Sequence, residues 1–347
     1  MTGTRLTLAV PGDLASRTGG YIYDARLLEE LRAKGIDARH LALPASFPRP
    51  SKADMDSAFD ALCRAAPDAP LLIDGLAFGA LDTARLATIP APLAALIHHP
   101  LALEAGLTPE DAEAFARREA ANLAHARIVI VPSPHTASVL ARDFGVAPSR
   151  ITVARPGRAE LSGGSAAPTS PPLILSVGML APRKGHDVLI RALDQVTDIA
   201  WRAEIVGPAR NPSTAAALQA DIAARGLSDR VTLLGEVSAA VLEQRYRAAT
   251  VFALATRYEG HGMVFDEAMA HGLPVVATRG GAVVETVPAC AGLLVDVDDA
   301  TGFAEALRTV LSDPARRQTL ARAARAHTEA LPRWTDTAAR VAAALAL

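Results

Sequence analysis

The chain is poor in the residues that staple small secreted domains, and it lacks the apolar runs that span membranes. Its 347 residues include two cysteines and only 4% aromatic residues. Cys63 and Cys290 fall in different halves of the chain, so we expect no disulfide framework and a reducing, cytoplasmic setting. No apolar run approaches the roughly 20 residues of a membrane span, and the first residues lack the apolar stretch of a signal peptide. Peripheral contact with the inner face of a membrane stays open.

The chain also lacks a large net charge of either sign. The formal net charge is −2, so we expect no nucleic-acid partner. Arginine supplies nearly all of the positive charge, because the only lysines are Lys34, Lys52 and Lys184. A lysine at 184 against that background indicates a need for a compact charge, such as one on a phosphate. The alternative is a solubilising surface pair with Arg183.

Half of the residues are apolar, and they recur in short runs that alternate with segments of helical period along the whole chain. This alternation predicts an α/β fold in which helices cover both faces of parallel sheets. The length favours two domains. The pattern breaks at 157–172, where Gly, Pro and Ser gather, so we predict a linker there. We therefore expect two Rossmann-like, doubly wound domains at 1–156 and 173–330, followed by a C-terminal helix within 331–347.

Two glutamates, Glu259 and Glu267, lie eight positions apart on either side of a helix start. The strand-like run 250–255 precedes the first glutamate, and the helix-like run 263–271 contains the second. A helix N-terminus presents unpaired N–H groups and a partial positive charge, which suit an anion. Carboxylates beside it can accept hydrogen bonds from hydroxyls. The combination is what a nucleotide sugar requires.

A second strand-to-helix loop carries two adjacent cations. The apolar run 173–177 leads into Gly178, and Pro182 stiffens the loop that follows. Arg183 and Lys184 lie at the mouth of this turn, and a helix of 3.6-residue period begins just after them. These two side chains are therefore candidate phosphate ligands.

The run from Tyr258 to Pro274 resembles the Glu-(seven residues)-Glu signature of retaining family 4 glycosyltransferases, also called glycosyl transferases group 1. The match includes Glu-Gly-x-Gly at 259–262 and Glu-Ala-Met-Ala-x-Gly-Leu-Pro at 267–274. The resemblance implies the glycosyltransferase B architecture, with two domains facing a central cleft and a C-terminal helix that crosses back to the first. It implies a retaining hexosyltransferase that uses a UDP- or GDP-linked sugar and a hydroxyl acceptor on a lipid, a saccharide or a small molecule.

The resemblance also implies roles for individual residues. It puts the donor diphosphate at Arg183 and Lys184, the donor sugar at Glu259 and the ribose at Glu267. Many members have Arg directly after the glycine of the cationic loop, whereas this chain has Met179, which removes one expected phosphate contact. The expected donor-binding residues are Gly19, Gly20, Arg183, Lys184, Val237, Glu259, Gly260, His261, Gly262, Met263, Val264 and Glu267.

Two strand ends in the first half carry further candidates. Gly19 and Gly20 precede a predicted helix and would permit a close backbone approach to a ligand, although they would also serve simply to shape a turn. The loop lacks the G-x-G-x-x-G pattern, which argues against a dinucleotide oxidoreductase. The second strand end carries His98 and His99. The resemblance implies that a histidine at this strand end lies near the reacting sugar. We expect His98 to act in catalysis with Glu259 and Lys184, and His99 and Glu104 to lie on the acceptor side.

An Asp-x-Asp sequence at 296–298 matches the metal motif of transferases with a different fold. Here it follows a predicted strand and precedes a helix, where acids are favoured without a metal. The sequence shows no His/Cys cluster with metal-ligand spacing, so we expect no metal and no other cofactor. Two alternatives stay open: a disaccharide or glucan synthase or phosphorylase of the same fold, and a non-catalytic sugar- or nucleotide-binding homologue.

Overall fold

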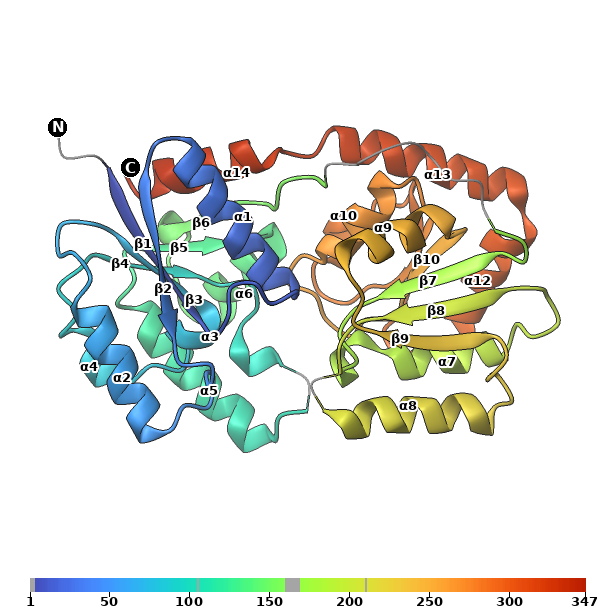
Figure 1. The fold of residues 1–347 in the computed structure, drawn as a ribbon, viewed down its shortest axis with the longest axis horizontal. Coiled ribbons are helices and arrows are strands. Elements are labelled where there is room, and N and C mark those ends of the chain that lie inside the picture. Colours follow the sequence, from blue (N-terminus) through green and yellow to red (C-terminus); the bar gives the residue numbers. More distant parts are fainter. Residues whose placement is uncertain (1–3, 105, 160–168, 210) are drawn as a thin grey trace. The chain divides into compact units, whose positions relative to one another are not determined.

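A computed structural model describes residues 4–104, 106–159, 169–209 and 211–347 (Figure 1). The chain forms two compact units, one of Met1–Gly157 with Pro332–Leu347 and the other of Arg158–Leu331. Most of the linker predicted at 157–172 lies outside the described residues. Within the described ranges, no helix is both long and apolar enough to cross a lipid bilayer.

The first unit is built on one six-stranded sheet with all strands parallel, in the order β2-β1-β3-β4-β5-β6. The strands are β1 (Arg5–Pro11), β2 (Asp37–Leu43), β3 (Leu71–Asp74), β4 (Leu93–Leu96), β5 (Ile128–Val131) and β6 (Ile151–Val153). The helices are α1 (Gly19–Ala33), α2 (Lys52–Cys63), α3 (Gly75–Phe78), α4 (Thr83–Leu86), α5 (Pro109–Leu123), α6 (Pro134–Asp143) and α14 (Trp334–Ala344), with 3-10 turns η1 (Leu101–Leu103) and η2 (Pro148–Arg150).

The second unit repeats this plan with the strand order β12-β11-β10-β7-β8-β9, again all parallel. The strands are β7 (Leu173–Val177), β8 (Arg202–Val206), β9 (Val231–Gly235), β10 (Val251–Leu254), β11 (Val275–Thr278) and β12 (Gly292–Val295). The helices are α7 (His186–Asp194), α8 (Pro212–Ala224), α9 (Ala239–Ala248), α10 (Met263–Ala270), α11 (Val283–Thr286), α12 (Ala300–Ser312) and α13 (Pro314–Glu329), with the 3-10 turn η3 (Pro182–Lys184).

The inner strands of the sheets, such as β7, β10 and β11, are buried along their whole length because both faces of each sheet are covered. In β7 all five residues are buried. Ile174 packs into the core beneath α7, α8 and α12, whereas Leu175 and Val177 pack into the core beneath α9, α10 and α13. Successive side chains of a strand point to opposite faces, so a continuous apolar run is what a doubly covered parallel sheet needs. The predicted α/β fold with two doubly wound sheets is confirmed.

Each sheet has a switch point, where the chain turns from adding strands on one side to adding them on the other. In the second sheet β7 is followed by β8 and β9 on one side, and β10 then pairs with β7 on the other side. In the first sheet β1 lies between β2 and β3. Ligands of such sheets bind beyond the carboxyl ends of strands at these points. The loops after β7 and β10, and those after β1 and β3, are therefore candidate ligand-binding loops.

The C-terminal segment belongs to the first unit, where α14 packs on α1 (Figure 1). The rings of Tyr23 and Trp334 meet edge to face, with centroids 5.4 Å apart. Thr337 Oγ1 donates a hydrogen bond to the carbonyl oxygen of Arg155 at 2.7 Å. These contacts tie the last helix to α1 and to the segment that follows β6.

Candidate functional site

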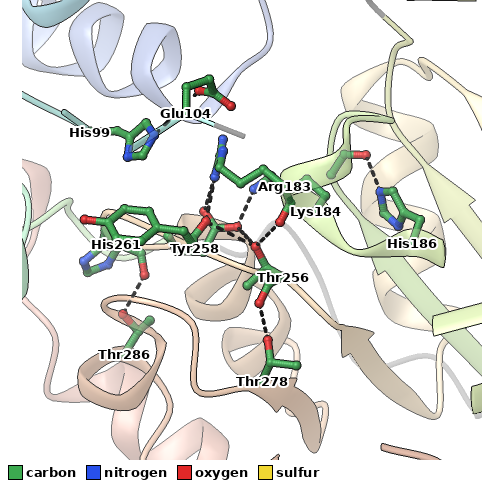
Figure 2. A network of polar contacts seen from close by, with 12 residues as sticks. His99, Glu104, Arg183, Lys184, His186, Thr256, Tyr258, His261, Thr278 and Thr286 are labelled. Carbon is green, nitrogen blue, oxygen red and sulfur yellow. Dashed lines mark hydrogen bonds and ion pairs between the residues drawn. The ribbon is translucent and has the colours of Figure 1, made fainter. Parts of the chain in front are cut away.

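The centre of the candidate site is an ion cluster around Glu259, at the switch point of the second sheet. Figure 2 shows its neighbours Arg183, Lys184, Thr256 and Tyr258 as labelled sticks. Lys184 Nζ, in the loop after β7, lies 2.6 Å from Glu259 Oε1, in the loop after β10. Arg183 Nη1 lies 3.5 Å from Glu259 Oε2 and donates to the carbonyl oxygen of Tyr258 at 2.8 Å. Thr256 Oγ1 donates to Glu259 Oε1 at 2.9 Å. Two loops that are 75 residues apart in sequence thus converge on one carboxylate.

The cluster holds Glu259 as an anion. The carboxyl group is buried, which acts to raise its pKa, but the charges of Lys184 and Arg183 outweigh burial and lower the pKa to about 2. His186, the first residue of α7 after this loop, is also buried, and burial lowers the pKa of its imidazole to about 4. His186 is therefore neutral at physiological pH, and it contacts the carbonyl oxygen of Gly178 at 3.2 Å.

Glycines allow the two loops to approach each other. Gly185 has φ of 64°, and a Cβ at this position would clash with the carbonyl oxygen of Ala255 at the end of β10. Gly281 has φ of 64° as well, and a Cβ there would clash with the backbone of Glu259. Only glycine combines a left-handed backbone with so close a contact at low cost. The backbone contacts seen at these two positions therefore depend on glycine.

Arg257 anchors the loop that carries Arg183 and Lys184. Its guanidinium forms two hydrogen bonds with the carboxylate of Asp187, at 3.0 and 2.8 Å, and one with Asp298 Oδ1 at 2.8 Å. It also donates to the carbonyl oxygen of Pro182, while its backbone N–H donates to the carbonyl oxygen of Arg183. The Asp-x-Asp sequence at 296–298 therefore supplies an arginine partner, which gives its second acid a structural role.

Glu267 lies in the second turn of α10, where it is half-buried. Tyr246 Oη, from α9, donates to Glu267 Oε2 at 2.9 Å. Burial raises the pKa of Glu267; the hydrogen bond from Tyr246 lowers it, and the charges of Asp266 and Glu243 raise it, with a net value of about 7. The two glutamates of the signature thus have opposite electrostatic environments, one held as an anion and the other close to its midpoint at neutral pH.

The turn between the glutamates is ordered by its own contacts. His261 Nε2 lies 2.6 Å from Asp266 Oδ2, and Thr286 Oγ1 donates to the carbonyl oxygen of His261 at 2.7 Å. Gly262 has φ of 90° and stands at the N-cap of α10, where it offers no side chain to cap the first N–H groups of the helix. Those groups belong to the helix start formed by Met263 and Val264. The other predicted donor residues, Gly260 and Val237, lie respectively beside Glu259 and between β9 and α9.

At the switch point of the first unit His98 contacts two buried aspartates. His98 Nε2 lies 2.8 Å from Asp24 Oδ1, on α1, and 3.8 Å from Asp74 Oδ2, at the end of β3. The ring of Tyr23 meets the imidazole edge to face at 5.0 Å. Burial lowers the pKa of His98, but the charge and hydrogen bond of Asp24 and the charge of Asp74 raise it to a net value above the ordinary one. Burial and the charge of Asp24 raise the pKa of Asp74 to about 7.

In the described ranges this trio is also the one group of three acid or histidine side chains whose ligand atoms lie close enough together, within 4.8 Å, to hold a metal ion. The 2.8 Å contact between His98 and Asp24 is a hydrogen bond in its own right, which accounts for the arrangement without a cation. That the protein needs no metal stays a prediction.

The remaining predicted residues of the first unit are the glycine pair and the two acceptor-side candidates. Helix α1 begins at Gly19, so the glycine pair forms its first turn and does not lie in the loop before it. A Cβ at Gly20 would lie 3.2 Å from His98 Cδ2, whereas one at Gly19 would meet nothing within 4 Å. His99 Nε2 lies 3.6 Å from Glu104 Oε2, so the two acceptor-side candidates contact each other.

Sequence reasoning did not find the partners of the predicted residues. Asp24, Tyr246 and Arg257 lie in segments with no recognisable motif, and each contacts its partner across at least 21 positions of sequence. Asp74 could have been predicted as a site residue from the sequence. It ends a strand that is otherwise apolar, so it lies at the carboxyl edge of the sheet. An acid placed there is a candidate for the same reason as His98.

The sequence and fold match known proteins. Residues 157–327 match the family model described as glycosyl transferases group 1. The chain is 38% identical over 174 residues to the GDP-mannose-dependent monoacylated alpha-(1-6)-phosphatidylinositol monomannoside mannosyltransferase of Corynebacterium glutamicum, covering 47% of this chain and 44% of that one. It is 30% identical over 256 residues to the D-inositol 3-phosphate glycosyltransferase of Thermobifida fusca, covering 68% and 58%. The matches thus span about half the length of these curated relatives.

Solved structures match nearly the whole chain. Sucrose-phosphate synthase from Thermosynechococcus elongatus superposes with a TM-score of 0.82 at 24% identity and covers 98% of both chains. HepE from Anabaena, in complex with UDP, superposes with a TM-score of 0.75 at 20% identity, covering 98% of this chain and 99% of that one. These likenesses show the fold, that of the glycosyltransferase B class. Through residues 157–327, the chain belongs to the glycosyl transferases group 1 family, as its signature predicted.

Proposed function

We propose that the protein is a retaining hexosyltransferase that moves a sugar from a nucleoside diphosphate to a hydroxyl acceptor without a metal ion. The observation that carries this proposal is the ion cluster of Lys184, Arg183 and Glu259 at the switch point of the sheet that matches the group 1 family. A diphosphate needs fixed cations and backbone N–H groups. The donor sugar needs, beside them, a group that accepts hydrogen bonds from its hydroxyls. This cluster and the uncapped start of α10 bring both together.

In the proposed reaction the bond between the sugar and the diphosphate breaks, and the leaving diphosphate gains negative charge. Lys184 and Arg183 would stabilise that charge, together with N–H groups at the start of α10. A fixed donor aimed at developing charge contributes about 3 kcal/mol to catalysis. Glu259, held as an anion by the cations, would accept hydrogen bonds from the donor sugar. By the family resemblance, His98 would hold either a hydroxyl of the donor sugar or the acceptor.

The names of the relatives support a choice of first substrates. The mannosyltransferase of Corynebacterium glutamicum is described as GDP-mannose-dependent, and its match lies over about half of this chain. We therefore propose GDP-mannose as the first donor to test, with UDP-linked hexoses as the alternative. Inositol phosphate and phosphatidylinositol mannosides are the first acceptors to test, since the relatives act on acceptors of that kind by name. A lipid acceptor would bring the protein to a membrane surface.

Ligand-induced stabilisation tests the donor site directly. Purified protein is melted with UDP, GDP, ADP and their sugar conjugates in the presence of EDTA. A ligand that binds only the folded state at a hundredfold excess over its Kd stabilises it by about 2.7 kcal/mol. We expect a shift with one nucleotide class that disappears in Lys184→Ala and persists in Lys34→Ala, a change at an exposed lysine of the first unit. No shift with any nucleotide would refute the proposal and favour a non-catalytic homologue.

A further inference from the structure

We propose that Tyr246 is a positioning residue for Glu267: its hydroxyl fixes one carboxylate oxygen, so that the other oxygen accepts a hydrogen bond from a ribose hydroxyl of the donor nucleotide. This inference rests on the proposed function, which places the ribose at Glu267. It adds a residue from α9 to a site that the sequence signature confines to α10 and the turn before it. It also defines which part of the nucleotide Tyr246 acts on.

The position of the Tyr246 hydroxyl is restricted by the packing of its ring against two other rings. The side chain is buried, with 3% of the residue exposed. Its ring stacks on the imidazole of His271 with centroids 5.1 Å apart and planes 6° apart, and it packs against Phe252 at 6.2 Å. A buried ring that packs against two others has little freedom in its torsion angles. The 2.9 Å hydrogen bond to Glu267 Oε2 is therefore a fixed feature of the α9–α10 contact.

The second oxygen of Glu267 is left for a ligand. No described residue donates a hydrogen bond to Glu267 Oε1. That oxygen is also absent from the buried, unpartnered atoms of the described residues, so it reaches solvent. A carboxylate with one oxygen anchored from the protein side and one oxygen open is oriented before a ligand arrives, which reduces the ordering cost of binding.

The charges around Glu267 determine its pKa together with the hydrogen bond from Tyr246. From α9 the carboxylate faces Glu243, which is paired with Arg247 at 2.8 Å and with His271 at 3.1 Å. On its own helix it follows Asp266, whose carboxylate contacts His261. From α13 Arg325 reaches only the carbonyl oxygen of His271, at 3.5 Å.

Among these groups Tyr246 is the donor that lowers the pKa of Glu267 against burial and two acids. Hydrogen bonds to an ionised acceptor are stronger than those to a neutral one. Tyr246 therefore favours the form of Glu267 that binds a hydroxyl better, in addition to orienting it.

The test compares a ribonucleotide with its analogue that lacks both ribose hydroxyls. Isothermal titration of the full-length protein with GDP and with 2′,3′-dideoxy-GDP, or with the uridine pair if the melting panel selects UDP, gives the preference for the hydroxyls. We expect wild type to prefer the ribonucleotide about tenfold, as for a hydrogen bond to a charged group. In Tyr246→Phe that preference falls to less than threefold, while affinity for the dideoxy analogue stays the same.

The pH profile separates positioning from a general loss of structure. The preference of the wild type rises between pH 6 and pH 8 as Glu267 loses its proton, and in Tyr246→Phe the rise moves to higher pH because the pKa of Glu267 is no longer lowered by the hydroxyl. Should the variant not fold, replacement of the four tyrosines by 3-fluorotyrosine provides a second measurement. The more acidic hydroxyl strengthens the hydrogen bond, so the preference is expected to increase.

The outcomes distinguish this inference from the proposal beneath it. A wild type that binds both nucleotides equally would overturn the assignment of the ribose to Glu267, and the role of Tyr246 with it. A wild type that prefers the ribonucleotide, beside a Tyr246→Phe variant with the same preference and the same pH profile, would overturn the role of Tyr246 alone. Unchanged preference in the fluorinated protein would count against it in the same way.

Discussion

Lys184 Nζ and Glu259 Oε1 lie 2.6 Å apart in a pair whose side chains are only 12% and 7% exposed. The pair joins the loops after two adjacent strands, so it holds the candidate site together as well as supplying its charges. Because we propose that the same cation binds the donor diphosphate, Glu259 and the diphosphate would share it. The stability of the second unit and its affinity for an anion are therefore coupled through one lysine.

Replacement of Lys184 by alanine should destabilise the protein in a pH-dependent way. Loss of one partner of a buried pair costs about 3–5 kcal/mol. The pKa of Glu259 is about 2 when folded and 4.5 ordinarily, so its ionised form contributes stability above pH 4.5 that is lost as the pH falls toward 2. Urea unfolding at pH 7, 5 and 3 should show a difference between wild type and Lys184→Ala that shrinks at the acidic end. A constant difference would contradict this account.

Gly185 should tolerate a methyl group far less well than another glycine of similar backbone. Gly185 and Gly226 have φ of 64° and 68°, but only at Gly185 would the added Cβ clash with backbone, whereas at Gly226 it meets nothing within 4 Å. Left-handed backbone alone costs a non-glycine residue about 1–2 kcal/mol. Gly226→Ala should therefore lose about that much stability, and Gly185→Ala at least twice as much. Equal losses in urea titrations would show that the loops separate freely.

Arg257 should influence donor binding without touching the donor. It fastens the cationic loop through Asp187, Asp298 and a carbonyl oxygen of the same loop. In Arg257→Ala we expect the Kd for the nucleotide to rise about tenfold, since a loop that must be ordered on binding costs affinity. Arg308→Ala removes a comparable two-bond pair with Asp198 at an exposed position and serves as the control. An equal effect of both changes on the Kd would rule out a local role for Arg257.

Asp24 should maintain the raised pKa of His98. The raised pKa means that the pair stabilises the fold below the ordinary pKa of 6.5, and that this contribution is lost as the pH rises through the folded value. Asp24→Asn keeps the shape but removes the charge, so the pKa of His98 should fall. The measurement is an NMR titration of the imidazole protons, with His98→Gln identifying the signal. A titration curve that does not move would mean that Asp74 alone sets the pKa.

Glu119 on α5 should weaken the first unit at alkaline pH. It is fully buried, Glu119 Oε2 accepts from the N–H of Leu101 at 2.9 Å, and burial raises its pKa from 4.5 to about 8. A raised carboxyl pKa means that stability falls as the pH rises from 4.5 toward 8, where the unfolded chain is ionised and the folded one resists ionisation. Glu119→Gln cannot ionise, so its urea midpoint should exceed that of wild type at pH 9 and match it near pH 5.

The predicted site residues divide into those that share a loop and those that only the fold brings near. The turn from Glu259 to Glu267 could be read directly, because glycine positions and the helix start after them are local features. The loop with Lys184 could be read for the same reason. Asp24 and Asp74 could not be connected with His98, since they lie 74 and 24 residues away in sequence. Hydrogen bonds between residues so far apart produce no periodic pattern in the sequence.

By itself, the sequence determined the alternation of strands and helices and the placing of the two glutamates around one helix start. These depend on hydrophobic period, glycine and proline, which act on neighbouring residues. Only the tertiary structure decided the partner of each charged group: Lys184 for Glu259, Arg257 for Asp298 and Tyr246 for Glu267. Strand order in a parallel sheet depends on how helices cover both faces at once, and it is strand order that decides which loops meet at a switch point.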